Sequence, residues 1–347
     1  MAGADAQYPG AIVVSLDFEL AWGVRRQATG GYASNLHGER VAIPRMLALF
    51  EEQGIAATWA TVGFLFAESR AELSSFSPPV EARPAYAEAD LSPYDDPIGE
   101  GEADDPLHYG LSMIERIRAT PRQEIATHTF SHYYCLAAGQ TPETFRADLA
   151  AALAIARRRG IEPSSVVFPR NQHNPAYDPI LRELGITAYR GNPRSWMWRF
   201  AGTENGSAPS RRAARLLDSY VDLSGGGAYP WSDVLQPNGL SDVRASAFLR
   251  PTTPRGRHLE PLRLRRIQGA LRGAAERGEI YHLWWHPHNF GRHPEENLGL
   301  LGAILGEFAR LRDELGMRSL SMAEVDRAVR AGVPGERMAV PAARPIF

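Results

Sequence analysis

The sequence is poor in three features that would narrow its class. It contains one cysteine, Cys135, so no intrachain disulfide and no cysteine-based metal site can form. No apolar run approaches the roughly 20 residues needed to cross a bilayer, and the N-terminus lacks a basic start followed by an apolar segment. The formal net charge is only −2, which argues against a general binder of nucleic acid or anionic membranes. We therefore expect a cytoplasmic protein that binds no nucleic acid and has no transmembrane segment.

The 347 residues have the composition of a globular protein, with 44% hydrophobic and 22% charged residues. Short apolar strands alternate with amphipathic helices along the chain, which is typical of a parallel sheet flanked by helices. The expected strands are residues 11–16, 55–60, 123–126, 164–168, 186–190 and 280–285. The expected helices are residues 39–53, 107–117, 141–159, 177–184, 211–219, 262–276, 295–315 and 321–331. We predict a single α/β domain over residues 1–347, with its core at about 11–330.

Two regions interrupt the alternation of strands and helices. The first, at about residues 74–105, is rich in proline, serine and acidic residues, and we interpret it as a long surface insertion over the mouth of the active site. The second, at about residues 195–258, contains Gly225–Gly227 and several prolines. We expect both to be irregular insertions in the same domain.

The strongest functional signal is the pair His128 and His132. Histidines four residues apart reach the same side of a helical turn, so both imidazoles can converge on one ion. Neutral imidazole is the commonest protein ligand for zinc, and a hydrolytic zinc site usually adds a carboxylate and keeps one position open. An isolated pair at this spacing also arises by chance, so its weight depends on other polar residues.

Further polar clusters follow predicted strands at the point where each strand ends. They are Asp17 and Glu19, then Arg170 and Asn171, and finally His286 and His288. In barrels of alternating strands and helices, the carboxyl ends of the strands converge on one face, and active sites lie there. The shared position of these clusters predicts an enzyme.

The chemistry follows from the residue types. Alternation along a strand places Asp17 and Glu19 on one face, roughly 6 to 7 Å apart. A divalent metal held by two histidines and one carboxylate lowers the pKa of a bound water from 15.7 towards roughly 7. The second carboxylate can accept the proton of that water, a later histidine can protonate the leaving nitrogen, and an arginine can keep the base ionised. Such a set hydrolyses an amide or an ester.

These residues resemble the motifs of the polysaccharide deacetylases with the NodB-homology domain, carbohydrate esterase family four, over about residues 11–330. The run His128-Thr-x-x-His132 is similar to the metal-binding motif of the family. The run Ser15-Leu-Asp-Phe-Glu19 is similar to its first motif, which usually holds two adjacent aspartates. Here Phe18 stands in the place of the second one, as in the branch with a D-x-E arrangement. The resemblance implies metal ligation by Glu19, His128 and His132 with Asp17 as base, although strand alternation also permits the two carboxylates to exchange roles.

Two more motifs extend the resemblance. Phe168-Pro-Arg170 is similar to the arginine motif, which implies that Arg170 orients the base. Leu283-Trp-Trp-His286-Pro is similar to the last motif, which implies that His286 is the general acid, with His288 as its competitor. The family's fold is a distorted (β/α) barrel, often with seven strands, and we expect that fold here. The expected cofactor is a divalent metal, zinc by default, although cobalt, nickel or manganese would also fit the ligands.

Other side chains are candidates for substrate contact. Trp22 and Trp196 could stack on a sugar ring, with packing in the core or a lid as the alternative. The backbone amide of Tyr133 could help to hold an oxyanion. Asn171 and His288 complete the predicted substrate-binding set.

The resulting hypothesis is a metal-dependent hydrolase that removes an acetyl or formyl group from the nitrogen of an amino sugar in a glycan or glycan precursor. One alternative is a hydrolase of a small non-sugar amide or cyclic imide. The other is a non-catalytic glycan-binding module that kept the barrel. The sequence gives no indication of the oligomeric state.

Overall fold

The computed structural model describes residues 8–25, 30–198, 209–254 and 256–332. Its strands are β1 (Ala11–Phe18), β2 (Ala57–Thr61), β3 (Gln123–Thr127), β4 (Ser165–Val166), β5 (Ala188–Tyr189), β6 (Ser241–Asp242), β7 (Ala247–Phe248), β8 (Ile280–Trp285) and β9 (Arg318–Leu320). They form one sheet in the order β6-β5-β4-β3-β2-β1-β8-β7, and β9 pairs with β1. The pairing is parallel throughout this sheet.

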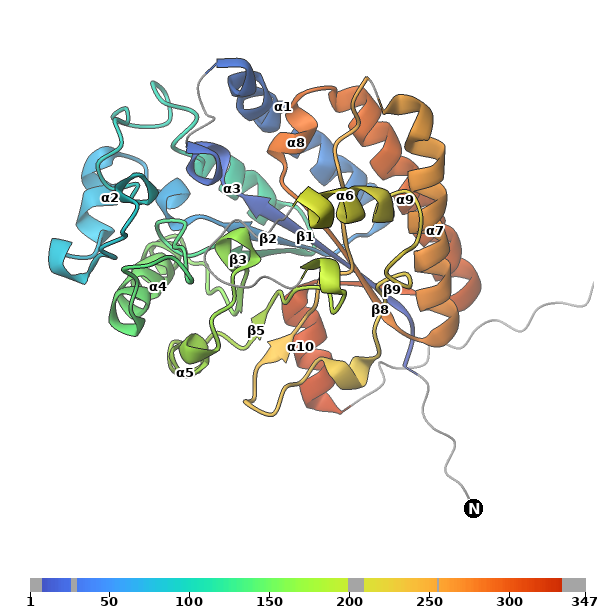
Figure 1. The fold of residues 1–347 in the computed structure, drawn as a ribbon. Helices are drawn as coiled ribbons and strands as arrows, with labels where there is room; N and C mark the ends of the chain where they lie inside the picture. The colour runs from blue at the N-terminus through green and yellow to red at the C-terminus, as the bar shows by residue number, and fades with distance from the viewer. Residues whose placement is uncertain (1–7, 26–29, 199–208, 255, 333–347) are drawn as a thin grey trace, which may run out of the picture.

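Helices surround the sheet, as Figure 1 shows. They are α1 (Ala33–Gln53), α2 (Arg70–Phe76), α3 (Leu111–Ala119), α4 (Pro142–Arg158), α5 (Asp178–Glu183), α6 (Pro209–Asp218), α7 (Glu260–Arg277), α8 (His288–Gly291), α9 (Pro294–Leu315) and α10 (Met322–Ala331). Among the residues described, no helix combines the length and the apolar character that a membrane span requires.

The sheet curls into a barrel, and the short segment between its two outer strands, β6 and β7, closes the gap between them. β6 and β7 are consecutive in the sequence, and the link between them bonds to both ends of the sheet. The Val243 N–H donates to the carbonyl of Tyr189 at 2.9 Å, and the Ser246 N–H donates to the carbonyl of His282 at 2.8 Å. This confirms the predicted distorted (β/α) barrel.

The strand count differs from the seven that we expected. The described residues contain nine strands, of which β6 and β7 have two residues each and β9 has three. A run of two or three residues carries no measurable hydrophobic period, so sequence patterning cannot detect it. The strands predicted at 164–168 and 186–190 are also reduced to two residues each, in β4 and β5.

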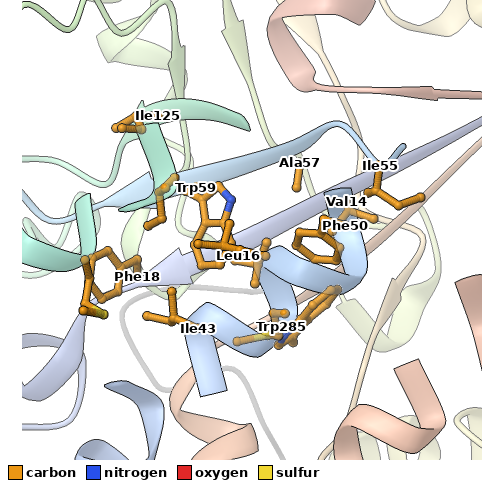
Figure 2. Packing of buried hydrophobic residues seen from close by; sticks show 14 of the residues in the cluster. Val14, Leu16, Phe18, Ile43, Phe50, Ile55, Ala57, Trp59, Ile125 and Trp285 are labelled. Carbon is orange, nitrogen blue, oxygen red and sulfur yellow. The ribbon is translucent and has the colours of Figure 1, made fainter. Parts of the chain in front are cut away.

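Helix α1 packs its apolar side against the centre of the sheet, as Figure 2 shows. The ring of Phe50 meets Trp59 of β2 edge-on at 6.2 Å between centroids, and Trp285 of β8 at 6.3 Å. Leu16 of β1 and Ile43 of α1 are fully buried in the same cluster. Burying each such side chain stabilises the fold by about 1.5 to 3 kcal/mol, so these contacts fix the ends of β1 and β8.

The first insertion packs against the residues that follow β1. The 3-10 turn η1 (Leu20–Gly23) carries Trp22, whose indole N–H donates to the carbonyl of His108 at 2.9 Å. The guanidinium of Arg25 pairs with Asp96, well inside the insertion. The second insertion contains α6, β6 and β7, but its residues 199–208 and 255 lie outside the part that the structure describes.

Helices α1 and α8 touch at a pair of glycines. A Cβ atom on Gly38 would lie 2.0 Å from the carbonyl oxygen of Gly291, and one on Gly291 would lie 1.9 Å from that of Asn35. Neither position has room for a side chain. Because α8 follows directly after β8, this close contact also places the loop at the end of β8.

We expect Gly291→Ala to lower the free energy of unfolding by about 1 to 3 kcal/mol, because the added methyl group must push two helices apart. Urea unfolding measures this change. Gly299→Ala in α9 is the matched control: Gly299 is exposed, and no described atom lies within 4 Å of the added Cβ. That change should instead stabilise the helix by about 0.5 to 1 kcal/mol. Equal effects at the two positions would contradict the packing described for α1 and α8.

Candidate metal and catalytic site

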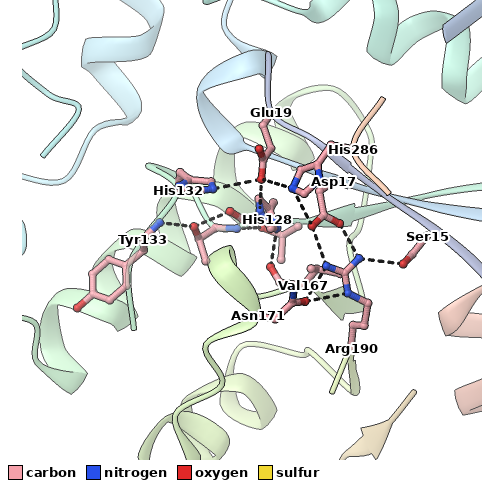
Figure 3. A network of polar contacts seen from close by, with 12 residues as sticks. Ser15, Asp17, Glu19, His128, His132, Tyr133, Val167, Asn171, Arg190 and His286 are labelled. Atoms are coloured by element: carbon pink, nitrogen blue, oxygen red, sulfur yellow. Dashed lines mark hydrogen bonds and ion pairs between the residues drawn. The ribbon is translucent and has the colours of Figure 1, made fainter. Parts of the chain in front are cut away.

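Polar side chains from three strands meet at the carboxyl ends of β1, β3 and β8, as Figure 3 shows. Glu19 Oε1 lies 2.9 Å from His128 Nε2 and 3.2 Å from His132 Nε2. One ligand atom of each residue falls within 4.8 Å of the other two, and all three residues are buried. The structure therefore brings together the three residues that the sequence predicted as metal ligands.

His128 is oriented by the backbone of the neighbouring strand. Its Nδ1–H donates to the carbonyl of Val167, just after β4, at 2.8 Å. In the neutral ring this bond assigns the proton to Nδ1 and leaves the lone pair of Nε2 directed at Glu19.

His132 also lies beside Glu19, but the backbone that carries it differs from the prediction. We expected His128 and His132 to share a helical turn, but the segment between them is a loop. Thr129 and His132 both have left-handed backbone angles, with φ of 65° and 57°. His132 Nδ1 has no hydrogen-bond partner among the residues described, so this ring is held by its backbone and by Glu19.

The position of Glu19 depends on a glycine four residues later. A Cβ atom on Gly23 would lie 1.6 Å from Glu19 Oε2, so only glycine leaves room for the carboxylate. Burial alone would raise the pKa of Glu19, but the nearby imidazoles of His286, His132 and His128 outweigh burial and hold the pKa well below its usual range. Glu19 is therefore an ionised carboxylate facing ring nitrogens.

The three residues fit a divalent cation. With Nδ1 of neutral His128 donating elsewhere, its Nε2 lone pair faces a carboxylate oxygen at 2.9 Å, and two acceptors repel unless a cation lies between them. Atoms that each lie about 2.0 to 2.2 Å from a zinc ion are roughly 3 to 3.5 Å apart. The Glu19–His132 distance of 3.2 Å falls in that range. Two nitrogens and one oxygen form a donor set suited to zinc.

Asp17, two residues before Glu19, is paired with an arginine. Arg190 Nη1 lies 2.6 Å from Asp17 Oδ1, and Nη2 lies 2.7 Å from Oδ2. Burial would raise the pKa of Asp17, but the charge and hydrogen bonds of Arg190 lower it below its usual value. This two-bond geometry keeps the carboxylate ionised and fixes its plane.

The arginine in this pair is not the one that we expected. Arg170 is exposed, and its guanidinium carbon lies 4.1 Å from the ring centroid of Tyr134. Arg170 has a left-handed φ of 56° in the 3-10 turn after β4, whereas Arg190 directly follows β5 and is buried. The prediction that Arg170 would pair with Asp17 is therefore wrong, and Arg190 makes that pair.

Arg190 is itself held by hydrogen bonds to two further side chains. Asn171 Oδ1 accepts from its Nη2 at 2.8 Å, and Ser15 Oγ accepts from its Nη1 at 3.0 Å. The hydroxyl of Ser15 lies 2.8 Å from His282 Nε2, and the Nδ1–H of His282 donates to the carbonyl of Val243 at 3.0 Å. Burial lowers the pKa of His282 to about 3, so the ring is neutral and accepts from Ser15. Ser15 and His282 thus extend the hydrogen-bond network of Arg190 across the sheet.

The two histidines after β8 differ in their exposure to solvent. His286 Nε2 lies 3.8 Å from Asp17 Oδ2 and 3.8 Å from Glu19 Oε1, and 25% of its side chain is exposed. His288 stacks on His286 with centroids 4.9 Å apart and is only 3% exposed. Burial lowers the pKa of His288 to about 3. His286 is thus the one that faces both carboxylates and is partly exposed to solvent.

The predicted substrate-binding residues differ in how far they are exposed to solvent. Trp22 is 1% exposed and packs in the core, so it has no open ring face for a sugar. The Tyr133 N–H donates to Thr129 Oγ1 at 2.7 Å, and its contact with an oxyanion stays a prediction. Trp196 is 56% exposed.

Comparison with solved structures finds a similar fold in several enzymes. A protein from Mycobacterium smegmatis described as a polysaccharide deacetylase has a TM-score of 0.56 at 14% identity, covering 100% of this chain and 98% of that one. A polysaccharide deacetylase from Pseudomonas aeruginosa has a TM-score of 0.50 at 12% identity, covering 94% and 92%. The allantoinase PuuE has a TM-score of 0.51 at 12% identity, covering 96% and 94%.

No protein-family model matches the sequence, and a search of curated proteins finds no match. At such low identities, structural likeness establishes the fold alone. The chain has the fold of the polysaccharide deacetylases, which confirms at that level the resemblance inferred from its motifs.

We expect Arg190→Met to lower the free energy of unfolding by about 3 to 5 kcal/mol, because it leaves the buried carboxylate of Asp17 unpaired. Urea unfolding at neutral pH measures the loss. The control Arg170→Met removes only a contact with one tyrosine ring and should cost at most about 1 kcal/mol. If the two variants lose the same amount, the assignment of Arg190 as the partner of Asp17 is wrong.

We also expect the neutral state of His282 to appear in the pH dependence of stability. Between about pH 3 and 6.5 the unfolded chain protonates this histidine and the folded chain does not, so stability rises with pH at up to about 1.4 kcal/mol per pH unit. His282→Gln keeps a donor and an acceptor but cannot titrate. From pH 5 to 6 its unfolding free energy should rise less steeply than that of the unchanged protein, by about 1 kcal/mol per pH unit. Parallel curves would show that His282 is charged in the folded state.

Proposed function

We propose that this protein is a metal-dependent hydrolase that removes an N-acyl group, acetyl or formyl, from an amino sugar of a glycan or glycan precursor. The observation that carries the proposal is the convergence of Glu19, His128 and His132 within 4.8 Å of one another at the strand ends. Asp17 and His286 lie at the edge of the same cluster, with His286 Nε2 3.8 Å from a carboxylate oxygen of each acid.

Glu19, His128 and His132 would hold the metal, with zinc as the first choice and cobalt, nickel or manganese also compatible with these ligands. When bound there, a divalent metal would polarise the acyl carbonyl and make a nearby water more acidic. Burial keeps bulk water away from these side chains and strengthens the field of each charge at the site.

Asp17 is the proposed general base. Its carboxylate is ionised because Arg190 outweighs the effect of burial, so it is in the form that accepts a proton from the attacking water. Arg190 holds both carboxylate oxygens, which fixes the direction from which the proton arrives. The hydrogen-bond chain through Ser15 to His282 keeps Arg190 in place.

His286 is the proposed general acid. It is the more exposed of the two histidines after β8, and its Nε2 faces the carboxylates across 3.8 Å. As the tetrahedral intermediate collapses, its proton passes to the leaving nitrogen. The amide bond then breaks to give a carboxylate and a free amine.

The glycan substrate is supported by likeness of fold to proteins described as polysaccharide deacetylases. Trp196, more than half exposed, offers an aromatic face of the kind that packs on sugar rings. The alternative, a small non-sugar amide or cyclic imide, is supported by the likeness to an allantoinase. A non-catalytic glycan-binding module would have no use for an acid and a base beside a metal site.

We expect purified protein to bind about one divalent metal per chain and to release acetate or formate from N-acylated amino sugars. A chelator should abolish release, and added zinc should restore it. The assay is run in parallel on small cyclic amides and imides, and activity on those alone would favour the alternative substrate class. Binding of glycans without turnover by the metal-loaded protein would refute the hydrolase.

A pair of variants separates the two carboxylates. Glu19→Gln should weaken metal binding by about 10-fold or more and abolish activity, because a neutral amide replaces the charged ligand. Asp17→Asn should retain the metal and lower kcat by about 10² to 10⁴, because it removes the base alone. Metal titration and acyl-release kinetics on both variants distinguish these outcomes. The reverse pattern would exchange the two roles.

A further inference from the structure

The two candidate histidine ligands are joined by a loop whose backbone is unfavourable. Between His128 and His132 the chain forms neither helix nor strand, and Thr129 and His132 adopt left-handed angles that β-branched and bulky residues rarely take. A segment of this kind persists only when its surroundings hold it in place.

Asp148 supplies that support from helix α4. Its Oδ1 accepts the N–H of Phe130 at 2.7 Å, and its Oδ2 accepts the N–H of Ser131 at 3.1 Å. The hydroxyl of Ser131 donates to the same carboxylate oxygen. Phe130 and Ser131 lie between the two histidines, so one carboxylate holds the middle of the loop through three donors.

The helix that carries Asp148 is firmly anchored. Thr141 and Thr144 form a capping box at its start, and Pro142 occupies its first turn. Phe145 and Leu149, on either side of Asp148, are fully buried in one core cluster. The loop is therefore fastened to a rigid element rather than to another loop.

The burial of this acid is itself costly. Asp148 is 1% exposed, and burial raises its pKa to about 6 despite the three hydrogen bonds that favour the charged form. A buried carboxylate without a cationic partner is expensive, and its observed hydrogen bonds all go to the segment between the proposed ligands.

We propose that Asp148 is a positioning residue that sets the metal affinity of the site by fixing the loop between His128 and His132. This inference rests on the proposed function, because it requires that the histidines bind a metal. Asp148 would act as a supporting group behind the ligands, and loss of such groups typically lowers metal affinity by 10- to 100-fold.

The test compares metal binding in full-length variants stripped of metal. Zinc affinity is measured by competition with a chromophoric chelator, and Tm is recorded with and without zinc. Asp148→Asn should raise the zinc Kd by about 10- to 100-fold and shrink the zinc-induced rise in Tm. Ser131→Ala removes one of the three donors and should raise the Kd by a smaller factor, about 2- to 5-fold.

The matched control is Asp326→Asn in α10. Asp326 is also buried and accepts from three donors: the hydroxyl of Thr187 at 2.8 Å, the hydroxyl of Ser241 at 2.6 Å and Nε of Arg330 at 2.7 Å. Its loss should lower the Tm of the metal-free protein but leave the zinc Kd within about twofold of the unchanged protein.

The outcomes separate this inference from the proposed function. If the unchanged protein binds no zinc, the proposed function fails and this inference fails with it. If the unchanged protein binds zinc and Asp148→Asn binds it equally well with only a lower Tm, Asp148 has a purely structural role and this inference alone fails. Should Asp148→Asn not fold, an unaltered zinc Kd in Ser131→Ala overturns the inference in the same way.

Discussion

The site depends on how two buried carboxylates at the end of one strand are balanced by positive charge. Asp17 and Glu19 are each 3% exposed, and an ionised carboxylate without a partner is very costly at such burial. Arg190 neutralises Asp17 through two hydrogen bonds. Glu19 faces Nε2 of His128 and of His132, and imidazoles carry no charge in the form that binds a metal, so these two residues do not neutralise it. The cation proposed beside His128 and His132 would supply the balancing charge.

Uncharged groups hold the carboxylates and the histidines of this site in position. Gly23 leaves space for the Glu19 carboxylate, and the carbonyl of Val167 sets the tautomer of His128. Helix α1 and the core around Phe50 hold the strands from which the ligands project. Packing and backbone geometry thus determine where the charged side chains of the site lie.

The sequence was sufficient to predict the barrel and most of the residues that converge at the candidate metal site. Glu19, His128 and His286 follow strands, and the carboxyl ends of parallel strands meet, so their convergence could be inferred from position alone. Arg190 is the last residue of the strand predicted at 186–190 and directly follows the observed β5, so the same rule could have included it. Whether Arg170 or Arg190 reaches Asp17 depends on the left-handed φ of Arg170, which sequence patterning does not encode. The loop between His128 and His132 was missed for a similar reason. Its conformation depends on contacts with helix α4, and such contacts leave no pattern in the sequence of the loop itself.

Strand β1 has an unusual place in the sheet. Its residues pair with β8 from Ala11 to Leu16, with β9 at its start and with β2 from Val14 onward, so both of its edges are occupied as far as Leu16. Local opening starts where backbone amides are exposed, and a strand flanked on both sides opens only with the rest of the domain. We therefore expect the strand that leads to Asp17 and Glu19 to exchange its amide protons late, together with the rest of the domain.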